Sequence, residues 1–416
     1  MGPPAVTRVR RRSRRHGAAV VTIPVIACGF WLAFPSIGTV FKYLGAPGLV
    51  AYVGIVLAAL WAARVWVLPR LTSCLTERQA IALAAVTLVG LVAAFVWLQP
   101  LLSVPRPGHG SDRNEALNLA TAELLHGRYP YYPKTRLGNP ISPLPGSLLL
   151  AAPFVWLGDS AYQTFVWLVV FFVAARRQLG SPRPALLLAW MALALSPAVA
   201  QEIVTGGDLL ANSIYVLVFI LALLRRPGRR SAWLYAVLLG IGLSSRANFL
   251  LLLPLVSSAL AQRAGWGRAL KLIAVSCAAF AAVTVPFWLA DPGGFSPLHT
   301  LHKFDAASSP FPFGGVVVLL VDAGLATTLS FQHRGNSQVT LLRDCAMVLA
   351  LPVVFMVATL SVRAGWADLA STGYGLWSIA FGLLGCAVGR GGRPGEGRAG
   401  PGGKAEARAT SPLGTE

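Results

Sequence analysis

Residues 81–98 read IALAAVTLVGLVAAFVWL, an uninterrupted run without a charged side chain. An apolar stretch of about 18 residues or more predicts a helix that spans a membrane. Similar runs recur at 18–34, 49–61, 164–174, 209–224 and 272–288. Hydrophobic residues occupy 55% of the 416 positions and charged residues only 12%, whereas soluble domains carry about a quarter charged residues. A soluble fold could not bury so much apolar surface, so the sequence predicts an all-α polytopic membrane protein.

The net charge of +20 raises the alternative of nucleic-acid binding. Such a protein gathers Lys and Arg on an otherwise polar surface. Here the basic residues stand between apolar runs instead, a pattern typical of cytoplasmic loops. We therefore expect a lipid bilayer as partner and no nucleic acid. The basic segments are 8–15, 176–177, 225–230, 263–271 and the tail from Arg390.

The charge distribution predicts a plasma-membrane protein with both termini in the cytoplasm. About twelve spans of roughly 20 residues fit the chain. They lie near 17–36, 47–67, 79–101, 160–177, 183–200, 209–225, 232–246, 248–262, 268–288, 313–330, 345–362 and 371–389. This topology leaves nine of the 35 Lys and Arg outside, five of them in one external loop at 103–142.

Three regions follow from this map. A basic cytoplasmic segment at 1–16 precedes a transmembrane domain at 17–390, and a Gly-, Pro- and charge-rich tail at 391–416 is expected to be disordered. Residues 145–157 are too short to span and fit a half-helix that returns at Gly158-Asp159. The pair 232–246 and 248–262 is also short for two full crossings.

The external loop carries the residues that could take part in catalysis or binding. Asp112, Arg113 and Glu115 open a short helix with apolar residues at helical spacing, and Gly127 fits its carboxy-terminal end. We expect this amphipathic helix on the outer membrane surface. Tyr131 and Lys134 follow, in a Tyr- and Pro-rich segment suited to lipid headgroups and phosphates.

Two interpretations of Asp112 remain open. With Glu115 three residues later, it resembles a capping box that would start a helix without any chemistry. Alternatively, Asp112 is a general base whose partial desolvation raises its basicity.

Other candidate residues lie near the predicted outer ends of later spans. Asp208 follows the Gly206-Gly207 pair, which allows a tight turn, and could itself cap the next helix. Arg246, in the segment SSRAN with Asn248, suits a phosphate, although a snorkelling or ion-paired Arg is the alternative. His302 and Lys303 lie in another outer loop, and we include them as binding candidates. No metal-ligand set is compelling; a divalent metal is not excluded and no cofactor is expected.

Three segments taken in order resemble bacterial members of the GT-C superfamily, which are integral-membrane glycosyltransferases of the mannosyl- and arabinosyltransferase kind. They are GSDRNEAL…LLHGRYPYY…GNPISPLPGSLLL from 110 to 150, LSPAVAQEIVTGGDLLAN at 195–212 and GIGLSSRANFLLLLPLV at 240–256. The similarity covers roughly residues 80–300. It implies a polyprenyl-phosphate sugar donor and an extracytoplasmic glycan, lipid or protein acceptor.

The resemblance also implies site roles. Asp112 matches the position of the catalytic base, with Glu115 as the adjacent acid. Asp208 matches a second acidic position lining the same cavity, and Arg246 the cation that faces the lipid phosphate. The implied reaction is an inverting hexosyl or pentosyl transfer. Two extra spans before the acidic loop, and no large soluble domain at the carboxy terminus, depart from the pattern and leave acceptor recognition open.

Two other functions compete with this hypothesis. A multi-span transporter or lipid flippase would show internal repeats and ionisable residues at mid-membrane. We find no repeat, but Asp322 lies inside a predicted span. A non-catalytic scaffold that kept the fold is the third possibility.

Overall fold

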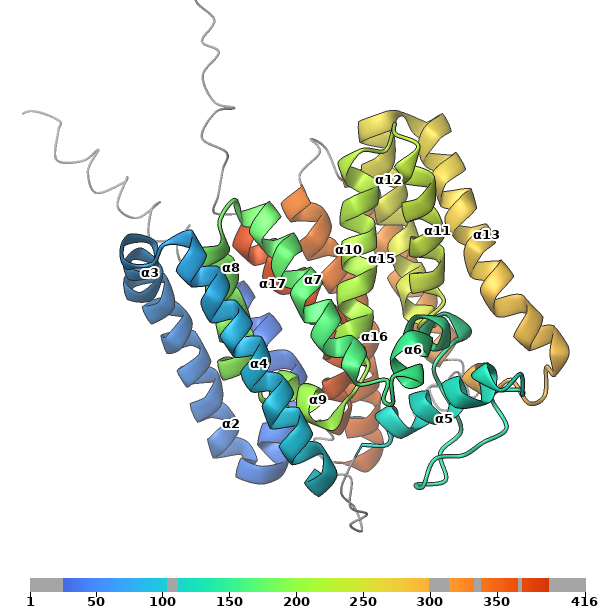
Figure 1. The fold of residues 1–416 in the computed structure, drawn as a ribbon, viewed down its shortest axis with the longest axis horizontal. Helices are drawn as coiled ribbons and strands as arrows, with labels where there is room; N and C mark the ends of the chain where they lie inside the picture. Colours follow the sequence, from blue (N-terminus) through green and yellow to red (C-terminus); the bar gives the residue numbers. More distant parts are fainter. Residues whose placement is uncertain (1–24, 103–110, 299–313, 333–337, 366–368, 389–416) are drawn as a thin grey trace, which may run out of the picture.

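A computed structural model describes residues 25–102, 111–298, 314–332, 338–365 and 369–388. In these ranges the chain is helical with connecting turns, and the only β pairing is one isolated bridge between Lys134 and Pro140. The predicted all-α class is therefore confirmed (Figure 1). The basic segment 1–16, the tail 391–416, and His302 with Lys303 lie outside the described residues.

The helices follow the apolar runs of the sequence. In chain order they are α2 (Ile37–Ala62), α3 (Leu68–Cys74), α4 (Glu77–Leu102), α5 (Arg113–Leu125), α6 (Pro145–Trp156), α7 (Tyr162–Leu179), α8 (Pro182–Leu195), α9 (Pro197–Thr205), α10 (Leu209–Arg225), α11 (Ser231–Leu243), the 3-10 helix η3 (Ala247–Leu252), α12 (Leu253–Ala264), α13 (Trp266–Ala290), α15 (Gly314–Gln332), α16 (Gln338–Ala364) and α17 (Leu376–Val388).

Among the residues that the structure describes, six helical segments are long and apolar enough to cross a membrane, or seven if the bent pair α8–α9 is one span. The predicted count of about twelve is therefore not confirmed. Several expected spans are short helices: α10 has 17 residues, α11 has 13 and α17 has 13. Conversely, the first two expected spans form one helical run, Val25–Cys74, with a kink where Gly45 has φ +65° two residues before Pro47.

The span expected at 183–200 is a bent pair of helices. Helices α8 and α9 meet at an angle of 88° around Ser196, which has extended backbone. Pro197 explains the break, because proline disfavours the α conformation in the preceding residue and offers no N–H to the helix. By contrast, the short helix at 145–157 is confirmed as α6, which ends in a turn at Gly158 and Asp159. The interruption between 232–246 and 248–262 is confirmed as well, at residues 244–246 between α11 and η3.

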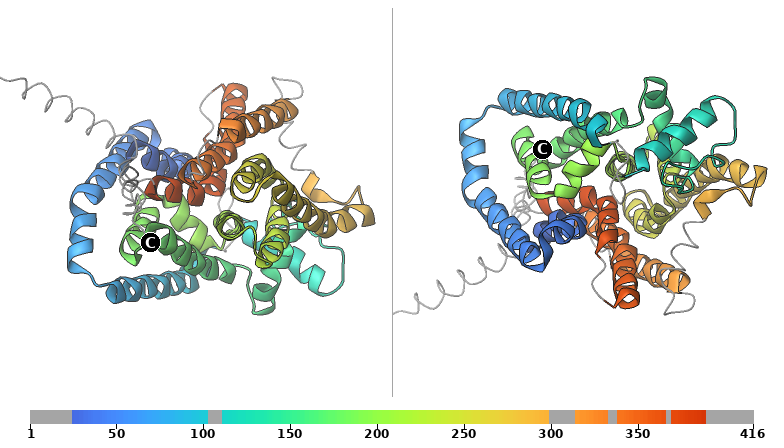
Figure 2. Two further views of the ribbon diagram at one scale, coloured as in Figure 1. Left: turned by 90° about the horizontal axis from the view of Figure 1, so that it is seen from above. Right: turned by 90° about the horizontal axis from the view of Figure 1, so that it is seen from below.

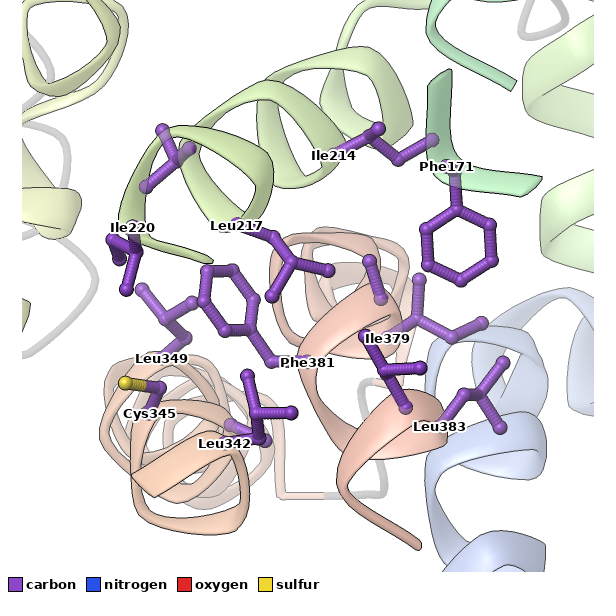
Figure 3. Packing of buried hydrophobic residues seen from close by; sticks show 14 of the residues in the cluster. Phe171, Ile214, Leu217, Ile220, Leu342, Cys345, Leu349, Ile379, Phe381 and Leu383 are labelled. Carbon is purple, nitrogen blue, oxygen red and sulfur yellow. The ribbon is translucent and has the colours of Figure 1, made fainter. Parts of the chain in front are cut away.

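Helix α10 forms the centre of the molecule. Of its residues, all but Val218, Ala222 and Arg225 are buried, as expected for a helix that is apolar on all sides. Figure 3 shows α10 packing through Leu217 and Ile220 against α16 and α17, with Phe171 of α7 nearby. Peripheral helices differ: on α4, Val86 is 67% and Trp97 is 71% exposed. So large an exposed apolar surface suits lipid better than water.

The Arg-rich helix ends gather together. Arg263 at the end of α12 donates to the Leu224 carbonyl of α10 at 2.6 Å. Arg268 of α13 stacks on Trp233 of α11, 4.5 Å from the ring centroid. Helices α5, α6 and α9 lie at the opposite end of the bundle, at the bottom of Figure 1 and facing the viewer in the right half of Figure 2. The chemistry-bearing segments are therefore separated from the basic loops by the length of the helices.

Candidate functional site

The short helix expected in the segment after α4 is present. A helix forms at Arg113–Leu125, and Gly127 follows its end with φ +70°. Leu117 and Ala120 of α5 are buried in a small apolar cluster that also contains Leu148 of α6 and Phe295. This packing holds α5 against α6, so the amino-terminal turn of α5 has a fixed position.

Asp112 anchors a neighbouring turn rather than capping its own helix. It occupies the N-cap position of α5, but its side chain makes no capping hydrogen bond. Instead, Oδ2 of Asp112 accepts hydrogen bonds from Thr135 Oγ1 at 2.6 Å and Asn139 Nδ2 at 2.8 Å. The capping interpretation of this side chain is therefore wrong, because its oxygen is already engaged by a turn more than twenty residues away.

The predicted rise in the basicity of Asp112 is also wrong. Burial alone would raise the pKa of this carboxyl. Hydrogen bonds from Thr135 and Asn139, a backbone hydrogen bond and the Arg113 charge together outweigh burial, so the pKa lies below its ordinary value. These donors favour the charged form. Asp112 is consequently an ionised, oriented carboxylate.

Glu115 holds the other side of the same turn. Its Oε1 accepts the backbone N–H of Arg136 at 2.8 Å, and its Oε2 lies 3.7 Å from Arg136 Nε. Glu115 therefore does not close a capping box. Lys134 begins this turn, facing Pro140 across the isolated bridge. Two acids of α5 thus dock residues 134–140 onto the start of their helix.

Arg113 joins the first turn of α5 to the connection between α9 and α10. Its Nη1 lies 3.2 Å from Glu202 Oε2, and its guanidinium stands 5.1 Å from the Tyr374 ring centroid. The other oxygen of Glu202 accepts the Leu209 N–H at 2.7 Å. The Gly206-Gly207 turn is confirmed: Gly206 has φ +71°, and a Cβ on Gly207 would lie 2.3 Å from Glu202 Cδ.

Asp208 and Arg246 form a buried ion pair. Arg246 Nη2 donates to Asp208 Oδ2 at 2.6 Å, with Asp208 0% and Arg246 12% exposed. The same oxygen of Asp208 accepts from Asn212 Nδ2 at 3.0 Å, and the side chain does not cap α10. Arg246 Nη1 donates to Ser142 Oγ at 3.2 Å, while Nε has no hydrogen-bond partner among the described residues. Of the alternatives for Arg246, the ion-paired arrangement is present.

The remaining candidates are placed differently from one another. Tyr131 is buried, donates to the Pro143 carbonyl at 3.2 Å and packs edge-on against Phe295. Burial raises its pKa well above the usual value, so the phenol stays neutral. Tyr131 therefore packs inside the protein, while Tyr132 beside it is exposed. Asn248 lies in η3, and its amide nitrogen has no hydrogen-bond partner within the described ranges.

A cavity of about 270 Å³ opens beside α5. The expected outer cavity was one lined by Asp112, Asp208 and Arg246, and none of these three lines it. Glu115 does, together with Asn114, Asn118 and Asp159, which sequence reasoning missed. The Asn114 and Asn118 pair one turn apart on one helix face was the available signal. Glu202 was also missed, because its partner Arg113 is 89 residues away in sequence.

Within the described residues, no group of three or more His, Cys, Asp or Glu side chains is arranged to hold a metal ion. The chain was compared with known proteins. No family model, curated protein or solved structure matches it.

Proposed function

We propose that the protein is an integral-membrane, inverting glycosyltransferase. It would move a sugar from a polyprenyl-phosphate donor to an extracytoplasmic acceptor. One observation carries this proposal: the ion pairs Arg113–Glu202 and Asp208–Arg246 lie next to each other at the turn between α9 and α10, where Glu202 also accepts the Leu209 N–H, and Asp112 directly precedes Arg113 in the chain. These residues lie at the helix ends opposite the Arg-rich loops. A lipid-linked substrate reaches such a site from the bilayer, whereas a soluble enzyme would need no apolar exterior.

The proposed topology includes more membrane-spanning helices than the long apolar segments alone. We propose about twelve passages of the chain across the plasma membrane. The kinked run Val25–Cys74 counts as two passages, and α7, α10, α11, α17 and the bent pair α8–α9 are added to the other five long segments. Neighbouring helices and paired polar groups permit such irregular segments at membrane depth. The Arg-rich ends would face the cytoplasm and the α5 end the outside, in accordance with the distribution of Lys and Arg.

In the proposed reaction, Asp112 acts as general base. The acceptor hydroxyl loses its proton to the Asp112 carboxylate as its oxygen forms a bond to the anomeric carbon. The bond from that carbon to the phosphate oxygen breaks on the opposite face, and polyprenyl phosphate leaves with the electron pair. Thr135 and Asn139 both bind Oδ2, so they fix the carboxylate while Oδ1 faces the hydroxyl. A fixed near-attack geometry contributes much of such a rate enhancement.

Arg246 would bind the donor phosphate. Asp208 holds the guanidinium through Nη2, and we assign it a positioning role rather than proton transfer. A phosphate oxygen would accept hydrogen bonds from two atoms of Arg246. They are Nε, which has no partner among the described residues, and Nη1, which donates only to Ser142. Charge-assisted hydrogen bonds of this kind are about twice as strong as neutral ones.

A transporter or lipid flippase is the second candidate, favoured by one observation. Asp322 of α15 is 0% exposed, and neither carboxylate oxygen has a hydrogen-bond partner among the described residues. Ionisable groups buried in membrane helices commonly mark ion or proton pathways. The glycosyltransferase proposal gives Asp322 no role.

The experiment is sugar transfer in membranes containing the protein. A panel of polyprenyl-phosphate sugars is supplied, and glycosylated product is detected by mass spectrometry. Arg246→Ala should raise the donor KM at least tenfold, and Arg246→Lys should restore only part of the activity because the planar fork is lost. Arg268→Ala, at the opposite end, is the matched control and should leave donor KM unchanged. If the wild type transfers no sugar but moves a lipid across the bilayer, the flippase candidate replaces this proposal.

A further inference from the structure

The cavity beside α5, which we call the α5 cavity, is lined by neither member of the Asp208–Arg246 ion pair. Residues from the end of α4, from α5, from the turn between α6 and α7 and from the end of α9 line this cavity. Figure 1 labels these helices. Its lining residues are Gln99, Leu102, Ser111, Asn114, Glu115, Asn118, Leu119, Arg136, Asp159 and Thr205. Ser111 precedes Asp112 in the chain, so the α5 cavity and the proposed base share the segment that begins α5.

The back of the α5 cavity is organised in advance. Asn118 Nδ2 donates to Asp159 Oδ1 at 3.1 Å, and Asn114 Nδ2 donates to Asp159 Oδ2 at 3.3 Å. Ser160 completes the group, donating through its hydroxyl to Asn114 Oδ1 at 2.8 Å and through its backbone N–H to Asn118 Oδ1 at 2.7 Å. These bonds fix three polar side chains before any ligand arrives, which lowers the entropic cost of binding.

Other lining groups have unused hydrogen-bonding capacity. The side chain of Gln99 lines the α5 cavity and makes no hydrogen bond within the described part of the chain. Oε2 of Glu115 is buried and accepts no hydrogen bond there. Glu115 Oε2 has only the 3.7 Å ion pair with Arg136 Nε, so the Gln99 and Glu115 side chains both have hydrogen-bonding capacity that a ligand or water in the cavity would use. Amide and carboxylate groups together offer both donors and acceptors, which is the pattern that sugar hydroxyls match.

The charge of the lining selects among possible ligands. Glu115 and Asp159 are two carboxylates, and Arg136 is the single cation, already close to Glu115. A phosphate would meet net negative charge here, so the α5 cavity does not suit the donor headgroup. A lipid chain would leave the polar lining unsatisfied. The volume of about 270 Å³ lies just below the roughly 300–1,000 Å³ of pockets for drug-sized ligands, which is adequate for one small ring.

We propose that the α5 cavity binds one neutral monosaccharide unit of a carbohydrate acceptor, an inference that rests on the proposed glycosyl transfer. Leu102 and Leu119 offer the apolar patch on which the C–H face of a sugar ring packs. Of the three acceptor classes left open by the sequence, glycan is the one whose chemistry the lining matches.

Cysteine protection tests the site without requiring activity. Thr205→Cys, on the wall of the α5 cavity, is placed in a Cys74→Ser, Cys277→Ser background, since these two native cysteines are exposed and Cys28, Cys345 and Cys386 are buried. Leu125→Cys, exposed at the far end of α5, is the matched control. The probes are methyl glycosides of mannose, glucose and arabinose, with inorganic phosphate for comparison.

At about 10 mM, at least one glycoside should slow maleimide labelling of Thr205→Cys by about threefold or more, as a millimolar dissociation constant requires. It should leave Leu125→Cys unaffected, and phosphate should protect neither. The proposal is overturned if no glycoside protects Thr205→Cys, if both cysteines are protected equally, or if phosphate protects as well as a sugar.

Kinetics separate this proposal from the proposed function. Gln99→Leu should raise the acceptor KM about tenfold and leave donor KM and thermal stability unchanged, because Gln99 has no partner to lose. Protection without any transfer would support the carbohydrate site and refute the glycosyltransferase. Transfer without protection, and with unchanged acceptor KM in Gln99→Leu, would refute the carbohydrate site and leave the glycosyltransferase standing.

Discussion

Asp112→Asn separates the catalytic role proposed for Asp112 from its role in docking the turn at 134–140. Both Thr135 and Asn139 donate to the same atom, Oδ2, and an amide oxygen can accept both bonds. A net hydrogen bond to a charged group is worth about 1.5–3 kcal/mol and a neutral one about 0.5–1.5 kcal/mol. The difference is about 1–1.5 kcal/mol per bond, or about 2–3 kcal/mol for both bonds in a fully buried site. Solvent screening at this partly exposed position reduces it to about 1–2 kcal/mol, so the turn stays docked.

The loss of a general base is larger than that structural cost. It typically lowers a rate by roughly 100- to 10,000-fold, or about 2.7–5.5 kcal/mol in the activation free energy. The control is Thr135→Val, a similarly sized change that removes the 2.6 Å hydrogen bond but keeps the carboxylate. If Asp112 is the base, Thr135→Val should lose less than about tenfold in kcat, while Asp112→Asn loses at least 100-fold.

The assay compares kcat for sugar transfer in both variants and in Glu115→Gln, with thermal stability measured in the same detergent. The catalytic assignment is refuted if Asp112→Asn transfers sugar within about threefold of the wild type. It is equally refuted if Thr135→Val and Asp112→Asn lose the same activity, because turn docking would then explain both. A selective loss in Glu115→Gln would move the base to Glu115, which lines the α5 cavity.

Three further predictions concern topology, the buried ion pair and pH. Leu137→Cys, 51% exposed in the docked turn, should react with a membrane-impermeant maleimide in intact cells; reaction only after lysis would invert the topology. Leu137 is preferable to Gly138, whose φ of +75° disfavours a side chain. Asp208→Ala should destabilise the protein by about 3–5 kcal/mol, because it leaves the Arg246 charge buried and unpaired. Adding Arg246→Met should recover much of this stability in thermal-melting measurements. If the two substitutions instead destabilise the protein additively, the ion pair is not the cause. The pKa of Asp112 is lowered from 3.8, so its stabilising contribution is present above that pH and is lost only as pH falls through the still lower pKa of the folded state. Hydrogen-exchange protection of the 134–140 amides, corrected for intrinsic rates, should therefore be unchanged from pH 7 to pH 5, and a loss of protection within that range would contradict the lowered pKa.

Local sequence patterns predicted much of the helical content. The run at 81–98 became part of α4, and Gly127 ended α5 as its conformational freedom allows. The bend at Ser196 was missed, although Pro197 stood in the sequence. Apolar periodicity continues across a proline, so hydrophobicity alone does not locate such a break. The span count of about twelve is not confirmed for a related reason, since helices buried in the bundle, such as α10, need not be long enough to cross a bilayer by themselves.

The sequence by itself determined that the chain is helical and apolar, which ends of the bundle are basic, and that acids begin the segment after α4. Each of these follows from composition or from neighbours within a few residues. Only the tertiary structure decided what the acids contact. Asp112 binds Thr135 and Asn139, and Asp208 binds Arg246, which is 38 residues away. A side chain at a helix start can cap that helix or reach another segment, and the choice depends on which donors the folded chain brings within about 3 Å of its oxygens.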